Sequence, residues 1–158
     1  MAASLDDIDR RIIELLRADG RMAIRSVAER AHISRANAYA RLARLREEGV
    51  VTGFTAVVNP ERVGRGLAAY ISVRIEQHSW ERFRGYLRDI PEVAHAALVS
   101  GDIDLLLLVR VADAAELRSL VLERLQRLPE VRSTQTMFIL DEPQLAPDMQ
   151  DSHLQEEP

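Results

Sequence analysis

Apolar residues recur at helical spacing in three short segments near the start of the chain. In the first segment they occupy four positions between 8 and 16, after a candidate cap at Ser4 or Asp6 and before a terminating Gly20. In the second, a shorter apolar stripe over residues 27–31 predicts a helix of about eight residues.

The third segment begins directly afterwards, at Ser34, a residue type that caps helices. Ala38, Leu42 and Leu45 form its apolar stripe, and Gly49 is placed to stop it. Three helices with a tight turn between the second and third are typical of a helix-turn-helix. The following stretch, VVTGFTAVV, is rich in β-branched residues and predicts a strand.

From residue 67 the pattern changes to the alternation of a strand. AYISVRI turns its apolar residues to one side. A helix capped by Ser79 follows, then two strands, VAHAALVS and DLLLLVRV. Asp113 and Glu116 predict a capping box for another helix, and VRSTQTMFIL predicts a last strand. The predicted order is βαββαβ.

A short internal repeat supports this order. LRDIPEVAHA (87–96) and LQRLPEVRST (125–134) lie 38 residues apart, and each runs from a helix end through Pro-Glu-Val to a strand start. A split βαβ fold needs equivalent helix-to-strand turns at these places. We therefore expect an α+β chain, with a helix-turn-helix followed by a ferredoxin-like domain.

With 158 residues, the chain is long enough for two small domains that each bury a core. We expect a helix-turn-helix domain over 1–52, a β-linker over 53–66, the ferredoxin-like domain over 67–141 and an acidic tail over 142–158. No apolar run reaches the roughly 18 residues that cross a bilayer. The start does not resemble a secretion signal, and there is no cysteine. These features predict a cytoplasmic protein.

Charge is distributed unevenly along this chain, whose net charge is −4. Residues 21–48 hold seven arginines and three glutamates, whereas the segment from Asp141 holds six acids and no base. On the third predicted helix, small alanines face outward between arginines. Such a face could enter a DNA groove about 12 Å wide, while the arginines reach phosphates or guanine edges. Alternatively, the same residues form a solvated face, because Arg and Ala are good helix formers. The residues expected at double-stranded DNA are Ser34, Arg35, Asn37, Tyr39, Arg41 and Arg44.

Longer motifs add a family resemblance over residues 4–141. LDDIDRRIIELLRADGR, SVAERAHIS and RLARLREEGVVTGFTAVVNP resemble the DNA-binding domain of the Lrp/AsnC (feast/famine) transcriptional regulators, and VSGDIDLLLLVRV resembles their effector-binding domain. The resemblance implies a winged helix-turn-helix joined to a ferredoxin-like domain. It also implies dimers that assemble into tetramers or octamers, and amino acids or related metabolites as effectors. The chain departs from the family at His32, where glycine is frequent, at Arg35, and at Leu105, where an aromatic residue is common.

The hinge between the two middle strands is a candidate ligand site. Glycine lets the backbone approach a ligand, and a carboxylate can accept hydrogen bonds from the ammonium group of an amino acid. The same residues could instead form an ordinary hairpin turn. Two threonines of the last strand could line the same cleft or lie on an exposed face, and the resemblance implies an apolar wall from a leucine and a methionine. The predicted effector site comprises Leu98, Gly101, Asp102, Asp104, Thr134, Thr136 and Met137.

The run LLLLV at 105–109 shows no alternation, so both faces of that strand are expected to be covered. Helices would cover one face, and the sheet of a second chain would cover the other. A two-fold dimer of this kind presents two recognition helices to a pseudo-palindromic operator.

An enzyme is the main alternative from another class. Asp102 and Asp104, with His95 nearby in sequence, could act as a carboxylate pair or as metal ligands. No third metal ligand, activated nucleophile or phosphate-binding glycine loop accompanies them. We expect no catalysis, no cofactor and no metal, and a sequence-specific regulator that responds to a small effector. An architectural DNA-coating protein without an effector is the alternative.

Overall fold

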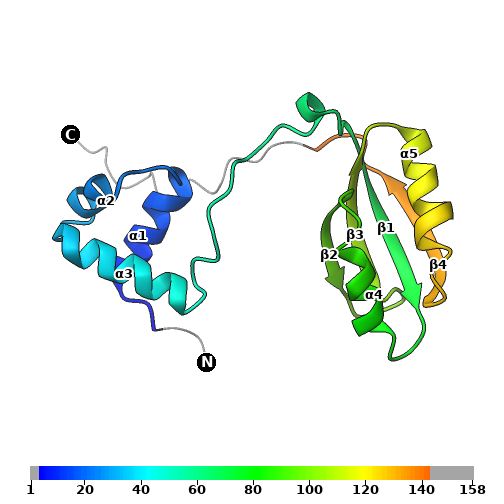
Figure 1. Ribbon diagram of the computed structural model, residues 1–158, viewed down its shortest axis with the longest axis horizontal. Coiled ribbons are helices and arrows are strands. Elements are labelled where there is room, and N and C mark those ends of the chain that lie inside the picture. The colour runs from blue at the N-terminus through cyan, green and yellow to red at the C-terminus, as the bar shows by residue number, and fades with distance from the viewer. Residues whose placement is uncertain (1–3, 143–158) are drawn as a thin grey trace, which may run out of the picture. The chain divides into compact units, whose positions relative to one another are not determined.

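The computed structural model describes residues 4–142, and these divide into two compact units between Val57 and Val58 (Figure 1). Apart from Glu142, the predicted acidic tail lies outside the described residues. Within the described range, every helix is too short or too polar to cross a membrane.

The first unit contains the three predicted helices, α1 (Asp7–Ala18), α2 (Ile24–Arg30) and α3 (Arg35–Glu47). Ile12, Val27 and Leu45 are fully buried, so one residue from each helix meets in the core. Of the two candidate caps for α1, the structure selects Asp6, whose Oδ1 accepts from the Asp9 N–H at 2.8 Å. The Ser34 hydroxyl caps α3 by accepting from the Asn37 N–H at 3.2 Å. The helix-turn-helix prediction is confirmed.

The turn between α2 and α3 contains His32, whose φ of 53° lies in the left-handed region that favours glycine. The Ala31 N–H donates to the Val27 carbonyl, and the Ile33 N–H donates to the Ala28 carbonyl. These bonds close the turn, and the His32 side chain is exposed. A residue other than glycine therefore keeps the tight turn, at the cost of some backbone strain.

The strand predicted for VVTGFTAVV is absent, and with it the expected β-linker. Residues 52–59 have no regular secondary structure, and Val57 is 99% exposed. β-Branched residues favour a strand only where a neighbouring strand accepts its hydrogen bonds, and no described strand pairs with this segment. A short 3-10 turn, Glu61–Val63, leads to the second unit.

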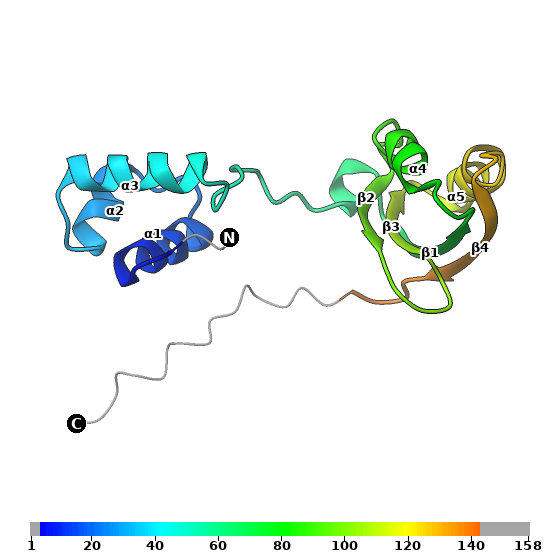
Figure 2. The same cartoon turned by 90° about the horizontal axis from the view of Figure 1, so that it is seen from below.

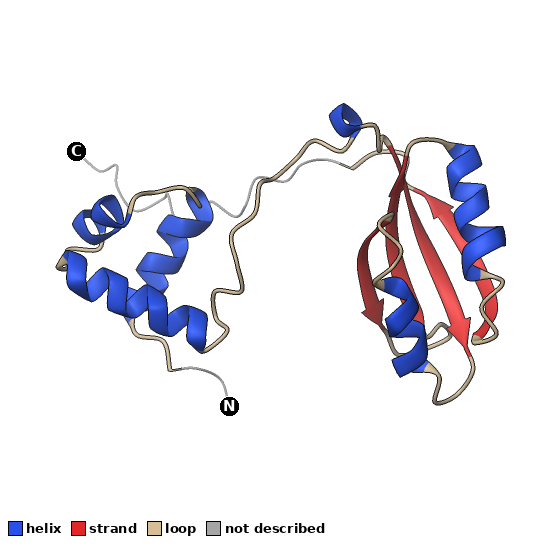
Figure 3. Cartoon of the chain, in the orientation of Figure 1, coloured by secondary structure: helices blue, strands red, loops and turns tan. Residues whose placement is uncertain are grey.

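The second unit contains β1 (Leu67–Ile75), α4 (Trp80–Leu87), β2 (Val93–Leu98), β3 (Leu105–Val111), α5 (Ala114–Ser119) and β4 (Val131–Phe138) (Figures 1 and 3). A π-helical segment, Leu120–Leu125, continues α5. The sheet is antiparallel with the order β2-β3-β1-β4. The predicted βαββαβ order and the ferredoxin-like fold are thus confirmed.

Both helices of this unit cover the same face of the sheet (Figure 2). On that face Ile71, Leu107 and Val109 are fully buried, and Phe83 of α4 packs into the same core. On the opposite face, Leu106 and Leu108 stay partly exposed in a single chain. The run 105–109 therefore has one face covered by helices and a second apolar face that the chain itself leaves open.

Two predicted helix caps have different outcomes. Asp113 caps α5, because its Oδ1 accepts from the Ala115 and Glu116 N–H groups, both at 2.9 Å. The Glu116 carboxylate accepts from the Ala112 N–H at 2.6 Å, one residue earlier than in a capping box. Ser79 does not cap α4. Its backbone is already helical, and its hydroxyl donates to the Glu76 carbonyl instead.

The internal repeat corresponds to two turns with the same hydrogen bonds. In the first turn, the Ile90 N–H donates to the Leu87 carbonyl and the Val93 N–H donates to the Ile90 carbonyl. The second turn has the same two bonds 38 positions later. The Leu128 N–H donates to the Leu125 carbonyl, and the Val131 N–H donates to the Leu128 carbonyl. The repeat therefore marks the equivalent turns that the split βαβ fold requires.

A buried carboxylate ties α1 to α3. Asp9 is 0% exposed; its Oδ1 accepts from Arg41 Nη1 at 2.8 Å, and its Oδ2 accepts from Arg44 Nη2 at 2.5 Å. We call Asp9, Arg41 and Arg44 the α1–α3 clamp. Burial acts to raise the pKa of Asp9, but the hydrogen bonds from Arg41 and Arg44 outweigh it and lower the pKa to about 2.

This pKa predicts how acid affects the first unit. Because the pKa of Asp9 is lowered from its ordinary 3.8 to about 2, the stabilisation is complete above pH 3.8 and is lost as the pH falls through about 2. A shift of this size corresponds to about 2 kcal/mol. We expect Asp9→Asn to lower the free energy of unfolding by about this amount at neutral pH and to flatten its acid dependence.

Urea unfolding of the helices, followed by circular dichroism over a pH series, measures both effects. Asp7→Asn is the matched control, because it removes one exposed charge from the same helix turn. Equal pH profiles for the two variants would show that the clamp does not stabilise the fold.

Candidate functional site

The outward face of α3 is built from small side chains. Ala38 and Leu45 are buried against the core, whereas Ala36, Ala40 and Ala43 are exposed. The helical rotation of about 100° per residue places these three alanines on one ridge, opposite the buried residues. We call them the alanine ridge.

Longer side chains lie on both sides of the alanine ridge. On one side are Arg35, Tyr39 and Arg46, all exposed, which fall within about 40° of one another around the helix. Within residues 4–142, neither Arg35 nor Arg46 forms an ion pair. Arg35 and Tyr39 belong to the set predicted at DNA, whereas Arg46, in the last turn of the helix, does not.

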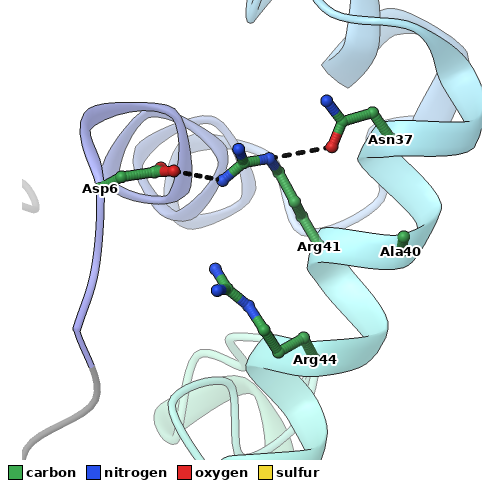
Figure 4. A pocket seen from close by; sticks show the side chains of 5 residues that line it. All are labelled: Asp6, Asn37, Ala40, Arg41 and Arg44. Atoms are coloured by element: carbon green, nitrogen blue, oxygen red, sulfur yellow. Dashed lines mark hydrogen bonds and ion pairs between the residues drawn. The ribbon is translucent and has the colours of Figure 1, made fainter.

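Asn37, Arg41 and Arg44 lie on the other side, toward α1 (Figure 4). Arg41 Nε donates to Asn37 Oδ1 at 3.0 Å, and Arg41 Nη1 donates to Asp6 Oδ2 at 2.7 Å as well as to Asp9. The Arg41 side chain is only 21% exposed, and that of Arg44 is 43% exposed. A pocket of about 270 Å³ opens here, lined by Asp6, Asn37, Ala40, Arg41 and Arg44. Arg41 and Arg44, two of the arginines predicted at DNA, are thus partly neutralised by carboxylates of the same unit.

Asp9 is the residue at this site that sequence reasoning missed, although the sequence carries a signal for it. On a helix, Asp9 lies about 60° from Ile12 and about 20° from Leu16, on the apolar side of α1. A charged residue on an apolar face is rarely buried without a partner. The position alone therefore predicts an arginine on the helix that packs against α1.

In the second unit, the hinge between β2 and β3 forms a turn with a structural role. Gly101 has a φ of 119°, which a residue with a Cβ adopts only with strain. Asp104 Oδ2 accepts from the Ile75 N–H at 2.8 Å, and the Asp104 N–H donates to the Val73 carbonyl at 3.1 Å. Asp102 is exposed. One of the two predicted carboxylates therefore supports the sheet, while the other faces solvent.

The remaining predicted effector residues are spread over the sheet. Leu98 and Thr134 lie in one row across it, on β2 and β4, which are opposite edges. Three strand spacings of about 4.8 Å separate them by about 14 Å. Thr136 lies in register with Ile71 on the helix-covered side, whereas Met137 pairs with Tyr70 on the open side. Within one chain, the predicted effector residues therefore lie too far apart to contact one small ligand together.

Potential metal ligands are also dispersed. Among the described residues, no three His, Asp or Glu side chains come close enough to hold a metal ion. His95 lies opposite Leu108 on the open side of the sheet, rather than beside Asp104.

Both units match described domain families. Residues 5–52 match a winged helix-turn-helix DNA-binding domain, and residues 68–149 match the Lrp/AsnC ligand binding domain. The two matched ranges contain α1 to α3 and nearly all of the sheet, respectively.

Curated relatives match over most of the chain. The chain is 33% identical over 140 residues to the HTH-type transcriptional regulator FL11 of Pyrococcus furiosus, which covers 89% of this chain and 92% of that protein. It is 33% identical over 141 residues to the leucine-responsive regulatory protein of Salmonella typhimurium, with coverage of 87% and 86%. A solved transcriptional regulator of Neisseria meningitidis in complex with L-Met has a TM-score of 0.84 and 30% identity over 96% of this chain and 100% of that one.

These relatives are transcriptional regulators and not enzymes. The chain belongs to the Lrp/AsnC family and is a DNA-binding transcriptional regulator with a ligand-binding domain.

Proposed function

We propose that this regulator binds a pseudo-palindromic operator as a dimer through α3, and that an amino acid or related metabolite controls its further assembly. The observation that carries the DNA-binding mode is the alanine ridge with exposed polar and charged residues beside it. A ridge of short side chains lets the helix backbone approach base edges in the major groove.

The two sides of the ridge have different roles at the DNA. Arg35 and Arg46 are exposed and can neutralise phosphates directly. Asn37 and Tyr39 lie near the start of α3, where a recognition helix contacts bases. Arg41 and Arg44 contribute less net charge, because Asp9 holds both of them.

Substitution at Arg35 tests the phosphate contact. Arg35→Ala should weaken binding to all duplexes and reduce the slope of log affinity against log salt by about 1. Asn37→Ala should instead change the preference among sequences. Fluorescence anisotropy over a salt series measures both. Arg11→Ala, an exposed arginine on α1, is the charge-matched control. An Arg35→Ala slope equal to that of the control would contradict this assignment.

The open face of the sheet supports the dimer. Met137, Tyr70 and Leu108 form one row across β4, β1 and β3 on the side without helices. Tyr70 and Met137 are exposed, and Leu108 is half-buried. An antiparallel sheet that faces water usually carries polar residues there, so an apolar row favours a second sheet as its cover. Isologous packing of this kind produces a two-fold dimer.

Introducing charge on this face tests the dimer. Leu108→Glu should give a monomer at micromolar concentration in sedimentation velocity, because a buried unpaired carboxylate strongly opposes association. Leu122→Glu on the π-helical segment places the same charge at an exposed leucine away from the sheet and should leave the dimer intact. A dimer that survives Leu108→Glu, with native circular dichroism, would rule out this interface.

The separation of the predicted effector residues supports a ligand shared between chains. Leu98 and Thr134 lie too far apart in one chain to hold one amino acid, so a site that uses both draws them from two chains. A ligand held in this way binds one assembly better than another and shifts the oligomer toward it. The solved regulator from Neisseria meningitidis was obtained with L-Met, which supports an amino acid as the ligand class.

A thermal-shift screen over the amino acids tests the effector. A ligand at 100 times its dissociation constant stabilises the fold by about 2.7 kcal/mol. Asp102→Ala should keep the melting temperature of the free protein but lose the shift. Asp104→Ala should destabilise the free protein itself by about 1–3 kcal/mol, because the Ile75 N–H loses its acceptor. If no amino acid shifts the wild type, the effector-independent architectural role is favoured instead.

A further inference from the structure

Arg41 is held by two carboxylates that differ in burial. Its Nη1 donates to Asp6 Oδ2 at 2.7 Å and to Asp9 Oδ1 at 2.8 Å. Asp9 is fully buried, whereas the Asp6 side chain is 53% exposed. Asp6 also lines the pocket between α1 and α3, and Figure 4 shows its contact with Arg41.

We propose that this pocket receives a phosphate of the DNA backbone, and that Asp6 is a built-in competing anion that the phosphate displaces from Arg41. The inference rests on the proposed binding of DNA through α3. It adds a binding site for one chemical group, a phosphodiester, and an autoinhibitory role for one carboxylate.

Asp6 can leave Arg41 without disturbing α1. Its two carboxylate oxygens have different partners. Oδ1 accepts from the Asp9 N–H at 2.8 Å and caps the helix, while Oδ2 accepts from Arg41. The bond from the Asp9 N–H and that from Arg41 lower the pKa of Asp6, so the carboxylate is charged at neutral pH. Asp9 cannot leave in the same way, because removing it from two arginines would strand a buried charge.

The pocket offers donors that suit a phosphate oxygen. Arg41 Nε donates to Asn37 Oδ1, which holds the guanidinium group at the pocket. Arg44 uses Nη2 for Asp9, and its side chain is 43% exposed at the pocket. Ala40 adds only a methyl group, so the donors are not screened from solvent.

The position of the pocket also favours a phosphate. The pocket flanks the alanine ridge, so a duplex whose groove receives the ridge brings its backbone to this side of α3. The occupant is therefore a group of the DNA rather than the effector.

Asp6→Asn tests the proposal because asparagine keeps the cap and removes the charge. Arg41 is then free of its exposed competitor. Affinity for a mixed-sequence duplex should rise by up to about fivefold, the upper end of the range for one exposed ion pair. The salt slope should steepen by up to about 1, because no carboxylate takes up a cation when the phosphate binds. The ratio of affinities for different sequences should not change, since a phosphate contact carries no base information.

Anisotropy titrations of the full chain over a salt series provide the readout, with Asp7→Asn as the control. This variant removes the same charge one residue away, from an exposed acid that holds no arginine among the described residues. It therefore measures the long-range effect of charge alone. A rise in affinity and slope for Asp6→Asn beyond that of Asp7→Asn supports the proposal.

Other outcomes overturn it in distinguishable ways. If the wild type binds DNA but the two variants match in affinity and slope, Asp6 does not compete, and the proposed function still stands. If Asp6→Asn weakens binding while circular dichroism is unchanged, Asp6 assists DNA binding rather than opposing it. A wild type that binds no duplex overturns the proposed function and this inference together.

Discussion

Asp9 lies on the apolar side of α1, where its burial would be strongly unfavourable without the two arginines of α3. α3 itself offers the core little apolar surface, since Ala38 and Leu45 are its only fully buried residues in the described structure. Most surface helices are held to their domain by a broad apolar stripe. In α3, the α1–α3 clamp contributes much of this attachment. A helix held in this way can present small and polar residues, such as the alanine ridge, on its remaining sides.

The second unit is held together mainly by an apolar core between its sheet and its helices. Its sheet has apolar residues on both sides of β3, and the helices bury only one of them. The first unit differs in having a fully buried carboxylate held by two arginines, so acid that protonates Asp9 weakens the packing of α1 against α3.

Local rules predicted the elements well, and non-local contacts account for what they missed. Helix periods, the Ser34 cap and the alternation in β1 depend on near neighbours, and each is present, except that Ser72, a polar residue of β1, is buried. The strand expected at VVTGFTAVV depends on a partner strand, which periodicity does not reveal. The clamp joins residues more than thirty positions apart. The separation of the predicted effector residues follows from the strand order, which places β2 and β4 at opposite edges and which sequence patterns do not reveal. Only Asp9, charged on an apolar stripe, was open to prediction.

The segment at 50–58, which pairs with no described strand, has the composition of a segment that can aggregate while the chain is being synthesised. It is uncharged, rich in β-branched residues and without proline, the composition of aggregation-prone stretches. During synthesis it emerges before the sheet that follows it. Glu47 and Glu48 precede it and Pro60 follows closely, residue types that act as gatekeepers beside such stretches. Flanks of this kind oppose the stacking of exposed strands, so we expect residues outside the alanine ridge and the sheet to affect how much of the synthesised chain folds.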